Sequence, residues 1–361
     1  MKFNSVGIAG LGLIGGSIAK SLKSNNSELN ISAFDYQEVL QKALSQNVID
    51  KALSSYSEIL KCELIILALP INASLKLFED LFPLLNENQC LIDVCSVKSP
   101  FAHKERSLKS LGKYVGLHPM AGREKGGFDN SDNLLFENAV CFICDSLPDE
   151  RTKTVLDFLK PTGLLFTFID ADLHDKITAE VSHLPQLLSV MLVNSTAKTE
   201  NGFNFINFAG SGFKDMTRIA SSDFKIWKEI IENNKANILN ALKDFRFALD
   251  ILSMKIEYND FEYLKNEFES ARKSREEISF NHKGFIQPLF DLTVFLKDEP
   301  GSLSRLTTIL FENNLNIKDI ELLKIREGSG GNFRLYFEST EDVERAKRVL
   351  TQNNFATNYT N

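Results

Sequence analysis

A glycine pattern near the amino terminus limits what this chain can fold into. The apolar run at residues 6–9 is typical of a buried strand, and Gly10, Gly12 and Gly15 follow it at once in the spacing G-x-G-x-x-G. Glycines in this spacing permit a tight turn, let the backbone approach a pyrophosphate, and let the next helix pack closely on the strand. An apolar pattern of helical period then begins at Ile14. We therefore expect a strand, a glycine turn and a helix whose N-terminus faces phosphate groups.

An acidic residue after the second predicted strand extends this interpretation. The strand covers residues 31–34 and ends at Asp35, which follows Gly15 by 20 residues. A carboxylate at this distance accepts a hydrogen bond from the ribose of NAD and repels the 2′-phosphate of NADP. The alternative is an ordinary glycine-rich turn with a solvated aspartate. The full pattern favours an NAD site made by Gly10, Leu11, Gly12, Leu13, Ile14, Gly15, Asp35, Leu69 and Pro70.

The composition argues against several classes of protein. The chain has 361 residues, of which 43% are hydrophobic, which is enough for roughly two or three globular domains. Its net charge of −7 argues against nucleic acid or an anionic membrane as a partner. No leader and no membrane-spanning run is visible, and the five cysteines fit buried thiols, so we expect a cytoplasmic protein. Cys141 and Cys144 have a metal-like spacing without a second pair, so no metal site is expected.

The hydrophobic pattern changes twice along the chain. Strand-like and helix-like segments alternate at first, which predicts an α/β domain of the doubly wound Rossmann type at residues 1–169. Helical periodicity dominates residues 170–283, with one helix expected to run through 224–254. This all-α middle domain has wide apolar faces, and we expect it to form a homodimer. Residues 288–361 show the order βαββαβ of a small ferredoxin-like module.

Five short motifs occur in a fixed order. They are Gly10-x-Gly12-x-x-Gly15, Asp93-x-x-Ser96-Val97-Lys98, His118-Pro119-Met120-Ala121-Gly122, Ser182-His183-Leu184-Pro185 and the segment at residues 209–220. Together they are specific, and through them the whole chain resembles prephenate dehydrogenase. The last module resembles an ACT domain, a fold that senses amino acids, through its turn at residues 298–303.

The resemblance implies a reaction and a set of roles. The family oxidatively decarboxylates prephenate to 4-hydroxyphenylpyruvate and reduces NAD. His118 would accept the proton of the ring hydroxyl as hydride leaves, because the pKa of imidazole lies near neutrality. Ser96 would hold the other imidazole nitrogen, and Arg218 would bind a substrate carboxylate. His183 would reach the substrate from the helical domain, and Lys98 would add positive charge.

These residues also have plainer structural interpretations. His118 would then bond a backbone carbonyl, Ser96 would cap the next helix, His183 would pack in the core, and Arg218 would pair with a nearby aspartate. The remaining histidines have no comparable setting, and we interpret them as surface or structural residues. They are His103, His174 and His282.

Two departures from the family pattern affect the choice of substrate. Gln186 stands where a second histidine is usual, and Arg123 stands where a small hydroxyl residue is usual. Gln186 is expected near the substrate, whereas Arg123 either offers another cation to a carboxylate or faces solvent. Arogenate dehydrogenase therefore stays open as an alternative, and a non-catalytic amino-acid sensor as another. The resemblance further implies feedback inhibition by tyrosine. The expected effector residues are Asp298, Pro300, Gly301, Asn316 and Ile317.

Overall fold

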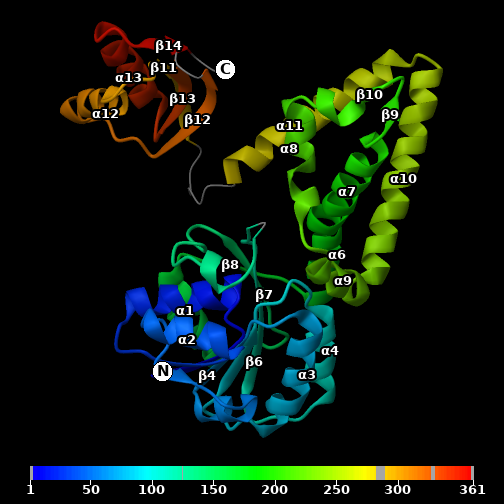
Figure 1. Cartoon of the computed structure of the whole chain (residues 1–361), viewed down its shortest axis with the longest axis vertical. Helices are drawn as coiled ribbons and strands as arrows, with labels where there is room; N and C mark the ends of the chain where they lie inside the picture. Colours follow the sequence, from blue (N-terminus) through cyan, green and yellow to red (C-terminus); the bar gives the residue numbers. More distant parts are fainter. Residues whose placement is uncertain (1–2, 124, 282–288, 327–329, 359–361) are drawn as a thin grey trace. The chain divides into compact units, whose positions relative to one another are not determined.

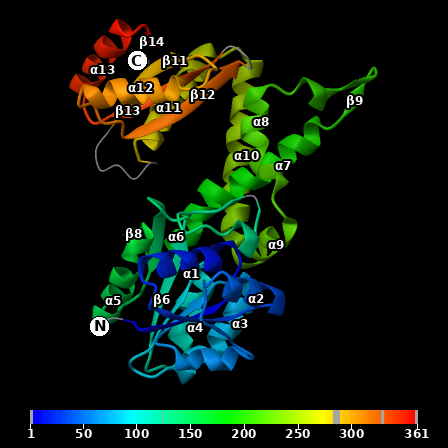
Figure 2. The ribbon, with the colours of Figure 1, turned by 60° about the vertical axis from the view of Figure 1, so that its left-hand side comes forward.

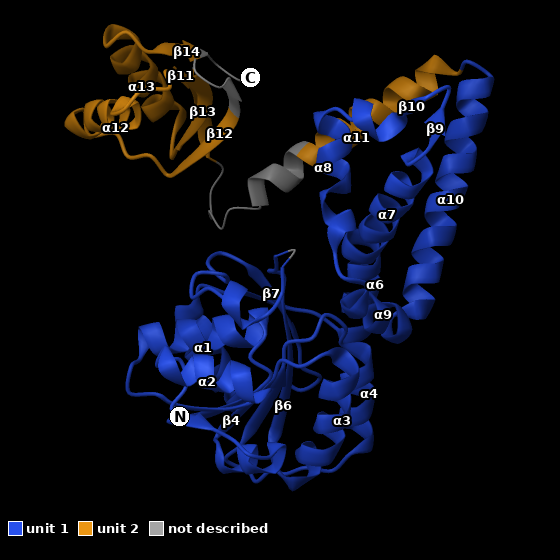
Figure 3. Ribbon diagram, viewed as in Figure 1, with its two compact units in different colours: residues 1–259 blue, residues 260–361 orange. Residues whose placement is uncertain are grey.

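The computed structural model describes residues 3–123, 125–281, 289–326 and 330–358. It divides into two compact units, residues 1–259 and residues 260–361, which are coloured separately in Figure 3. The first unit joins the α/β part to most of the helical part. The predicted boundary between the middle and last domains, at residues 283–288, lies outside the described residues.

A sheet of eight strands organises the first unit, in the order β3-β2-β1-β4-β5-β6-β7-β8. Strands β1 to β6 pair in parallel, whereas β7 pairs antiparallel to β6. The strand order reverses between β1 and β4, and such switch points are where doubly wound sheets bind ligands. The strands are β1 (Ser5–Ala9), β2 (Asn30–Phe34), β3 (Lys51–Ala52), β4 (Leu64–Leu67), β5 (Cys90–Asp93), β6 (Lys113–Pro119), β7 (Val140–Cys144) and β8 (Leu165–Phe168).

Helices cover both faces of this sheet, which confirms the doubly wound prediction (Figure 1). One face packs against α1 (Leu13–Asn25), α2 (Gln37–Ser45) and α5 (Glu150–Leu159). The other face packs against α3 (Ile71–Leu81) and α4 (Ser99–Ser107) through aliphatic and aromatic side chains. Burial on both faces explains why the central strands read as continuous apolar runs.

The helical part of the first unit begins at α6 (Ala171–Thr178), whose N-terminus is capped by Asp170 through the N–H groups of Asp172 and Leu173. A π-helical turn at Ala179–His183 leads into α7, which lies beside α10 (Figure 2). The remaining elements are α7 (Leu184–Thr196), the hairpin β9 (Thr199–Glu200) and β10 (Phe203–Asn204), α8 (Ser211–Thr217), a 3₁₀ turn at Arg218–Ser221, α9 (Phe224–Asn233) and α10 (Lys235–Glu257).

The prediction of one helix through residues 224–254 is wrong. The chain leaves helical geometry at Asn234, where φ is −123° and ψ is 25°. The buried side chain of Asn234 donates to the carbonyl oxygen of Asp175 at 2.7 Å and contacts His183. The break therefore places a polar side chain between helices, which apolar periodicity does not reveal.

The second unit contains α11 (Phe261–Asn281) and a four-stranded sheet in the order β12-β13-β11-β14. Two helices pack on one face of this sheet through Leu306, Leu335 and Val343, as predicted for a βαββαβ module. Within the described residues, no helix is both long and apolar enough to cross a membrane. The elements are β11 (Phe290–Leu296), α12 (Ser302–Glu312), β12 (Asp319–Arg326), β13 (Gly330–Phe337), α13 (Thr340–Gln352) and β14 (Ala356–Asn358).

Candidate active site

The glycine turn after β1 has the geometry of a pyrophosphate cradle. Gly10 has φ +96°, and a Cβ there would lie 2.6 Å from the carbonyl oxygen of Ala68. A Cβ on Gly15 would collide with the carbonyl oxygen of Gly10, whereas a Cβ on Gly12 would meet nothing within 4 Å. Two glycines thus permit close packing, and the third faces open space. Helix α1 starts at Leu13 without a side-chain cap, so its first N–H groups are available to an anion.

Asp35 lies against this turn. One carboxylate oxygen accepts the N–H of Leu11 at 2.5 Å, and the other accepts the N–H of Tyr36 at 2.6 Å. Leu11 itself is fully buried, so it helps to position Asp35 rather than facing a ligand. Leu69 follows β4, and its backbone nitrogen lies against Gly10. Pro70 is exposed directly after it, so the predicted cofactor residues gather at the switch point of the sheet.

A chain of hydrogen bonds ends at His118, near the end of β6. Its Nδ1 lies 2.8 Å from Nε2 of His174 on α6, and Nδ1 of His174 lies 2.8 Å from a carboxylate oxygen of Asp175. The expectation that Ser96 holds the second nitrogen of His118 is therefore wrong, since His174 occupies that position. Sequence reasoning missed His174, and its one local signal was the neighbouring Asp175.

Asp175 anchors this chain of hydrogen bonds to the N-terminus of α4. Its two oxygens accept the backbone N–H groups of Lys98 and Ser99, each at 2.8 Å, at the start of α4. Burial acts to raise the pKa of Asp175, but hydrogen bonds from His174 and from those two N–H groups outweigh it and leave the pKa below its usual value. Asp175 is therefore an ionised acceptor near neutral pH.

His118 is a neutral imidazole at physiological pH. Burial is the largest cause that holds its pKa well below 6.5, and the nearby ammonium of Lys98 acts in the same direction. Its Nε2 has no hydrogen-bond partner among the described residues. A neutral imidazole with a free nitrogen can accept a proton from a bound hydroxyl.

His183, in the π-helical turn, is held differently. It is buried, and its Nδ1 lies 3.2 Å from the amide nitrogen of Asn234. The same amide nitrogen of Asn234 donates to the carbonyl oxygen of Asp175, which identifies it as the nitrogen and not the oxygen of the amide. It therefore donates to His183 as well, so Nδ1 of His183 accepts and Nε2 carries the proton. Burial lowers the pKa of His183 to about 4, although Asp175 acts in the opposite direction. His183 is thus a neutral hydrogen-bond donor.

The expectation that Lys98 adds positive charge beside a substrate is wrong. Its side chain is fully buried and pairs with Asp93, and its ammonium donates to the carbonyl oxygen of Leu117 at 2.7 Å. Asp93 also accepts the hydroxyl of Tyr114 at 2.6 Å and the N–H of Cys95 at 2.9 Å. Lys98 therefore joins β5 to β6 inside the protein.

The other three expected substrate residues occupy different settings. Gln186 is buried and donates to the carbonyl oxygen of Ile219 at 2.9 Å, so it ties the turn that contains Arg218 to α7. Arg218 is exposed on that turn. Arg123 pairs with Asp132 at 2.5 Å, on the opposite side of the loop that follows β6. Gln186 thus supports a neighbouring segment instead of presenting its amide to a ligand.

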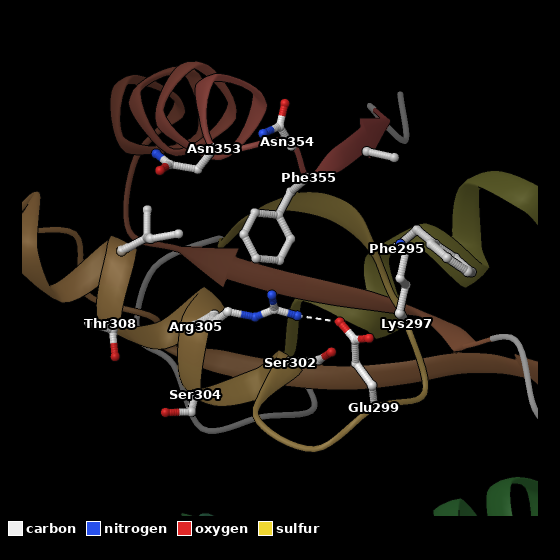
Figure 4. A pocket seen from close by; sticks show the side chains of 12 residues that line it. Phe295, Lys297, Glu299, Ser302, Ser304, Arg305, Thr308, Asn353, Asn354 and Phe355 are labelled. Carbon is white, nitrogen blue, oxygen red and sulfur yellow. Dashed lines mark hydrogen bonds and ion pairs between the residues drawn. The ribbon is translucent and has the colours of Figure 1, made fainter.

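The second unit has a cavity of about 640 Å³ beside the loop between β11 and α12. Figure 4 shows Arg305 and Glu299 paired with each other among the residues that line it. Ser302 also lines it, and its buried hydroxyl has no hydrogen-bond partner among the described residues. A second cavity of about 340 Å³ includes Asp298 and Gly301. The other expected effector residues line neither cavity, and they are Pro300, Asn316 and Ile317.

Comparison with known proteins covers the chain almost from end to end. Residues 18–167 match the family described as prephenate dehydrogenase, nucleotide-binding domain, and residues 170–270 match its dimerization domain. Residues 290–354 match the ACT domain. The chain is 33% identical to a prephenate dehydrogenase of Bacillus subtilis (strain 168), over 95% of this chain and 94% of that protein. It is 31% identical to the prephenate dehydrogenase of Lactococcus lactis subsp. cremoris, over 98% of each.

Solved structures agree with these matches. The prephenate dehydrogenase of A. aeolicus, in complex with hydroxyphenyl propionate and NAD+, is 29% identical with a TM-score of 0.71, over 77% of this chain and 99% of that chain. The arogenate dehydrogenase of Synechocystis is 28% identical with a TM-score of 0.66, over 76% of this chain and 99% of that chain. The family matches and the relatives aligned over nearly their full length agree with the dinucleotide fold and with the neutral histidine at the end of β6. This chain therefore belongs to the prephenate dehydrogenase family.

Proposed function

We propose that this protein is an NAD-dependent prephenate dehydrogenase that forms 4-hydroxyphenylpyruvate in tyrosine biosynthesis. The observation that supports this most strongly is His118, a neutral imidazole on β6 whose Nε2 is free among the described residues. β6 runs parallel to β1 and β4 in the same sheet, and the glycine turn follows the carboxyl end of β1. A base and a dinucleotide site on one edge are what oxidation of a ring hydroxyl requires.

The residues of the chain have separate tasks in this proposal. NAD, bound along Gly12, the start of α1 and Asp35, supplies the hydride acceptor. His118 takes the proton of the substrate hydroxyl on Nε2, which makes departure of hydride from the same carbon favourable. Loss of a carboxylate as carbon dioxide then leaves an aromatic ring, so decarboxylation needs no further electron sink.

Two groups are proposed to hold the carboxylates of the substrate. Arg218 offers a guanidinium that binds a carboxylate through two parallel hydrogen bonds. His183 offers a neutral N–H donor. Ser96 is half-buried in the loop after β5, and we propose that its hydroxyl donates a hydrogen bond to the ring hydroxyl of the substrate.

The second candidate function is arogenate dehydrogenase, and it is favoured by one observation. Gln186, which replaces the usual histidine, uses its amide on the carbonyl of Ile219 and brings no positive charge to the site. The experiment is a comparison of NADH formation with prephenate and with arogenate, at equal concentrations of NAD. The proposal predicts a higher kcat/KM for prephenate, and a clear preference for arogenate would replace it with the alternative.

Tyrosine is proposed as the effector of the second unit. The cavity in Figure 4 joins a cation, Arg305, to an acid, Glu299, and adds the unsatisfied hydroxyl of Ser302. These groups match the carboxylate, the ammonium and a polar atom of a free amino acid. Arg305→Ala in the full chain should raise the concentration of tyrosine needed for half-inhibition by about 10-fold, as expected for loss of one charge-assisted contact. Inhibition at unchanged tyrosine concentration would contradict this site.

A homodimer is proposed from the helical part of the first unit. Large apolar side chains are exposed on its helices and turns, and exposed patches of this kind mark interfaces. They include Met191, Ile206, Phe208, Met216, Ile226, Leu239 and Phe247. Light scattering at micromolar concentration should give twice the mass of one chain, and a monomeric mass would contradict the proposal. The free and buried cysteines fit a protein that works in the reducing cytoplasm.

A further inference from the structure

We propose that His174 and Asp175 are positioning residues, which hold His118 in the tautomer that carries its proton on Nδ1 and leaves Nε2 as the acceptor. The inference rests on the proposed function for its kinetic consequences. The tautomer itself is a property of the protein without substrate. Three adjoining groups carry the argument, namely a carboxylate and two imidazole rings linked by two contacts of 2.8 Å.

The direction of the hydrogen bonds follows from what Asp175 is able to do. An ionised carboxylate only accepts, and its oxygens already accept the N–H groups of Lys98 and Ser99. Nδ1 of His174 must therefore carry the proton in its contact with Asp175. The proposal takes His174 in its neutral form, in which Nε2 is then a lone pair.

The proton on His118 is fixed in the same way. Because Nε2 of His174 accepts, Nδ1 of His118 must donate across their 2.8 Å contact. The single proton of a neutral His118 is thus on Nδ1, and Nε2 is the lone pair that faces away from His174. The opposite tautomer would place two lone pairs against each other inside the protein and would present a proton where the base must accept one.

The surroundings hold the three groups in place. His174 is fully buried, and its ring makes a T-shaped contact with the ring of Phe142, with centroids 5.4 Å apart. Asp175 is fixed by the N-terminus of α4, while His118 is fixed by the strand pairing of β6 with Phe142 on β7. The contact of 2.8 Å between Nδ1 of His118 and Nε2 of His174 then sets the orientation of the His118 ring.

The proton balance of the reaction step agrees with this arrangement. The substrate hydroxyl gives its proton to Nε2 of His118, while the Nδ1 proton stays on His118 and continues to point at His174. The imidazolium that forms lies one ring away from the carboxylate of Asp175. Asp175 stays ionised throughout and takes up no proton.

Two substitutions of similar size separate positioning from packing. His174→Gln keeps an oxygen that accepts from Nδ1 of His118 and an amide that donates to Asp175, whereas His174→Leu keeps the bulk and removes both. We expect His174→Leu to lower kcat by about 10- to 100-fold and to change KM by less than about 3-fold. This loss is smaller than the roughly 10²- to 10⁴-fold loss of kcat expected when His118 itself is removed. His174→Gln should recover most of the loss. Equal kcat in the wild type and in His174→Leu would overturn the proposal, as would equal losses in both variants.

Nitrogen NMR on histidine-labelled full-length protein reads the tautomer directly and requires no turnover. The chain has 5 histidines, and a His118→Asn sample assigns the signal of His118. The proposal predicts a protonated Nδ1 and an unprotonated Nε2 in the wild type, and a mixture of tautomers in His174→Leu. A protonated Nε2 in the wild type would overturn it. If His174→Leu fails to fold, the wild-type spectrum still decides.

These readouts also separate failure of the positioning role from failure of the proposed function. If the wild type shows the expected tautomer but reduces no NAD with prephenate or arogenate, the proposed function is wrong and the tautomer assignment stands. If the wild type turns over prephenate with the opposite tautomer, the positioning role is wrong and the proposed function stands.

Discussion

Replacing Lys98 by methionine should destabilise the first unit and leave substrate affinity unchanged. The ammonium of Lys98 is fully buried against Asp93, and breaking such a pair leaves an uncompensated buried charge. Removal of one partner of a buried ion pair costs about 3–5 kcal/mol of folding free energy. Asp93 keeps the hydroxyl of Tyr114 and the N–H of Cys95 as donors. The expected loss is therefore near the lower end, about 3 kcal/mol.

The measurement is thermal unfolding of the full chain followed by tryptophan fluorescence. The chain has 1 tryptophan, Trp227, which packs against the core of the first unit, so its signal reports that unit. A loss of about 3 kcal/mol corresponds to a fall in Tm of about 6–12 °C for a unit of this size. The double variant Lys98→Met/Asp93→Asn removes both charges and should recover more than half of the loss.

Kinetics on the same variants decide between a structural and a substrate-binding Lys98. We expect KM for prephenate to stay within about 2-fold of the wild type, because the ammonium has no exposed surface through which to reach a ligand. An unchanged Tm together with a KM raised 10-fold or more would refute this reasoning and would indicate that Lys98 binds the substrate.

The remaining predictions concern the base, the cofactor turn and pH. His118→Asn should lower kcat by roughly 10²- to 10⁴-fold with little change in KM, as single-turnover and steady-state assays will measure; near-normal turnover would exclude His118 as the base. Gly12→Val should weaken NAD binding in titration calorimetry without lowering Tm, because a Cβ at Gly12 meets no protein atom within 4 Å. Gly15→Val should lower Tm, because its side chain would collide with the backbone of Gly10. A lower Tm for Gly12→Val with an unchanged Tm for Gly15→Val would contradict the pyrophosphate cradle. Because the pKa of His118 lies well below 6.5, kcat/KM should stay level from neutral pH down through pH 6.5 and fall only as the imidazole protonates in more acidic solution; a midpoint at or above 6.5 would contradict its burial. The pKa of His183 is lowered from 6.5 to about 4 in the folded protein, so between these pH values the unfolded chain binds more protons than the folded one. The free energy of unfolding of the first unit, measured by urea titration, should therefore decrease as pH falls from 6.5 to 4.

The glycine turn and the layers of the first unit were predictable because each rests on local pattern. Gly10 and Gly15 sit where a side chain would meet backbone, and their spacing alone indicates this. The alternation of apolar runs and helical periods likewise indicated both the doubly wound sheet and the βαββαβ module. The break at Asn234 was not predictable, since it depends on contacts with Asp175 and His183, which are distant in the sequence.

The partners of the site residues were harder to predict than the residues themselves. A lysine after a strand reads as a surface cation, and only the packed sheet reveals that Lys98 turns inward to Asp93. His174 has no motif of its own, and its contact with His118 joins residues 56 positions apart. Sequence spacing identifies groups with the right chemistry at the sheet edge, while burial and long-range pairing decide which nitrogen or oxygen remains for a ligand.

The most direct test of the account measures all products of one reaction. Purified protein is incubated with NAD and prephenate, and NADH, carbon dioxide and 4-hydroxyphenylpyruvate are quantified together, with His118→Asn as the matched control. The account predicts equal amounts of the three products from the wild type and almost none from the variant. NADH without carbon dioxide, or equal product from the variant, would contradict oxidative decarboxylation with His118 as the base.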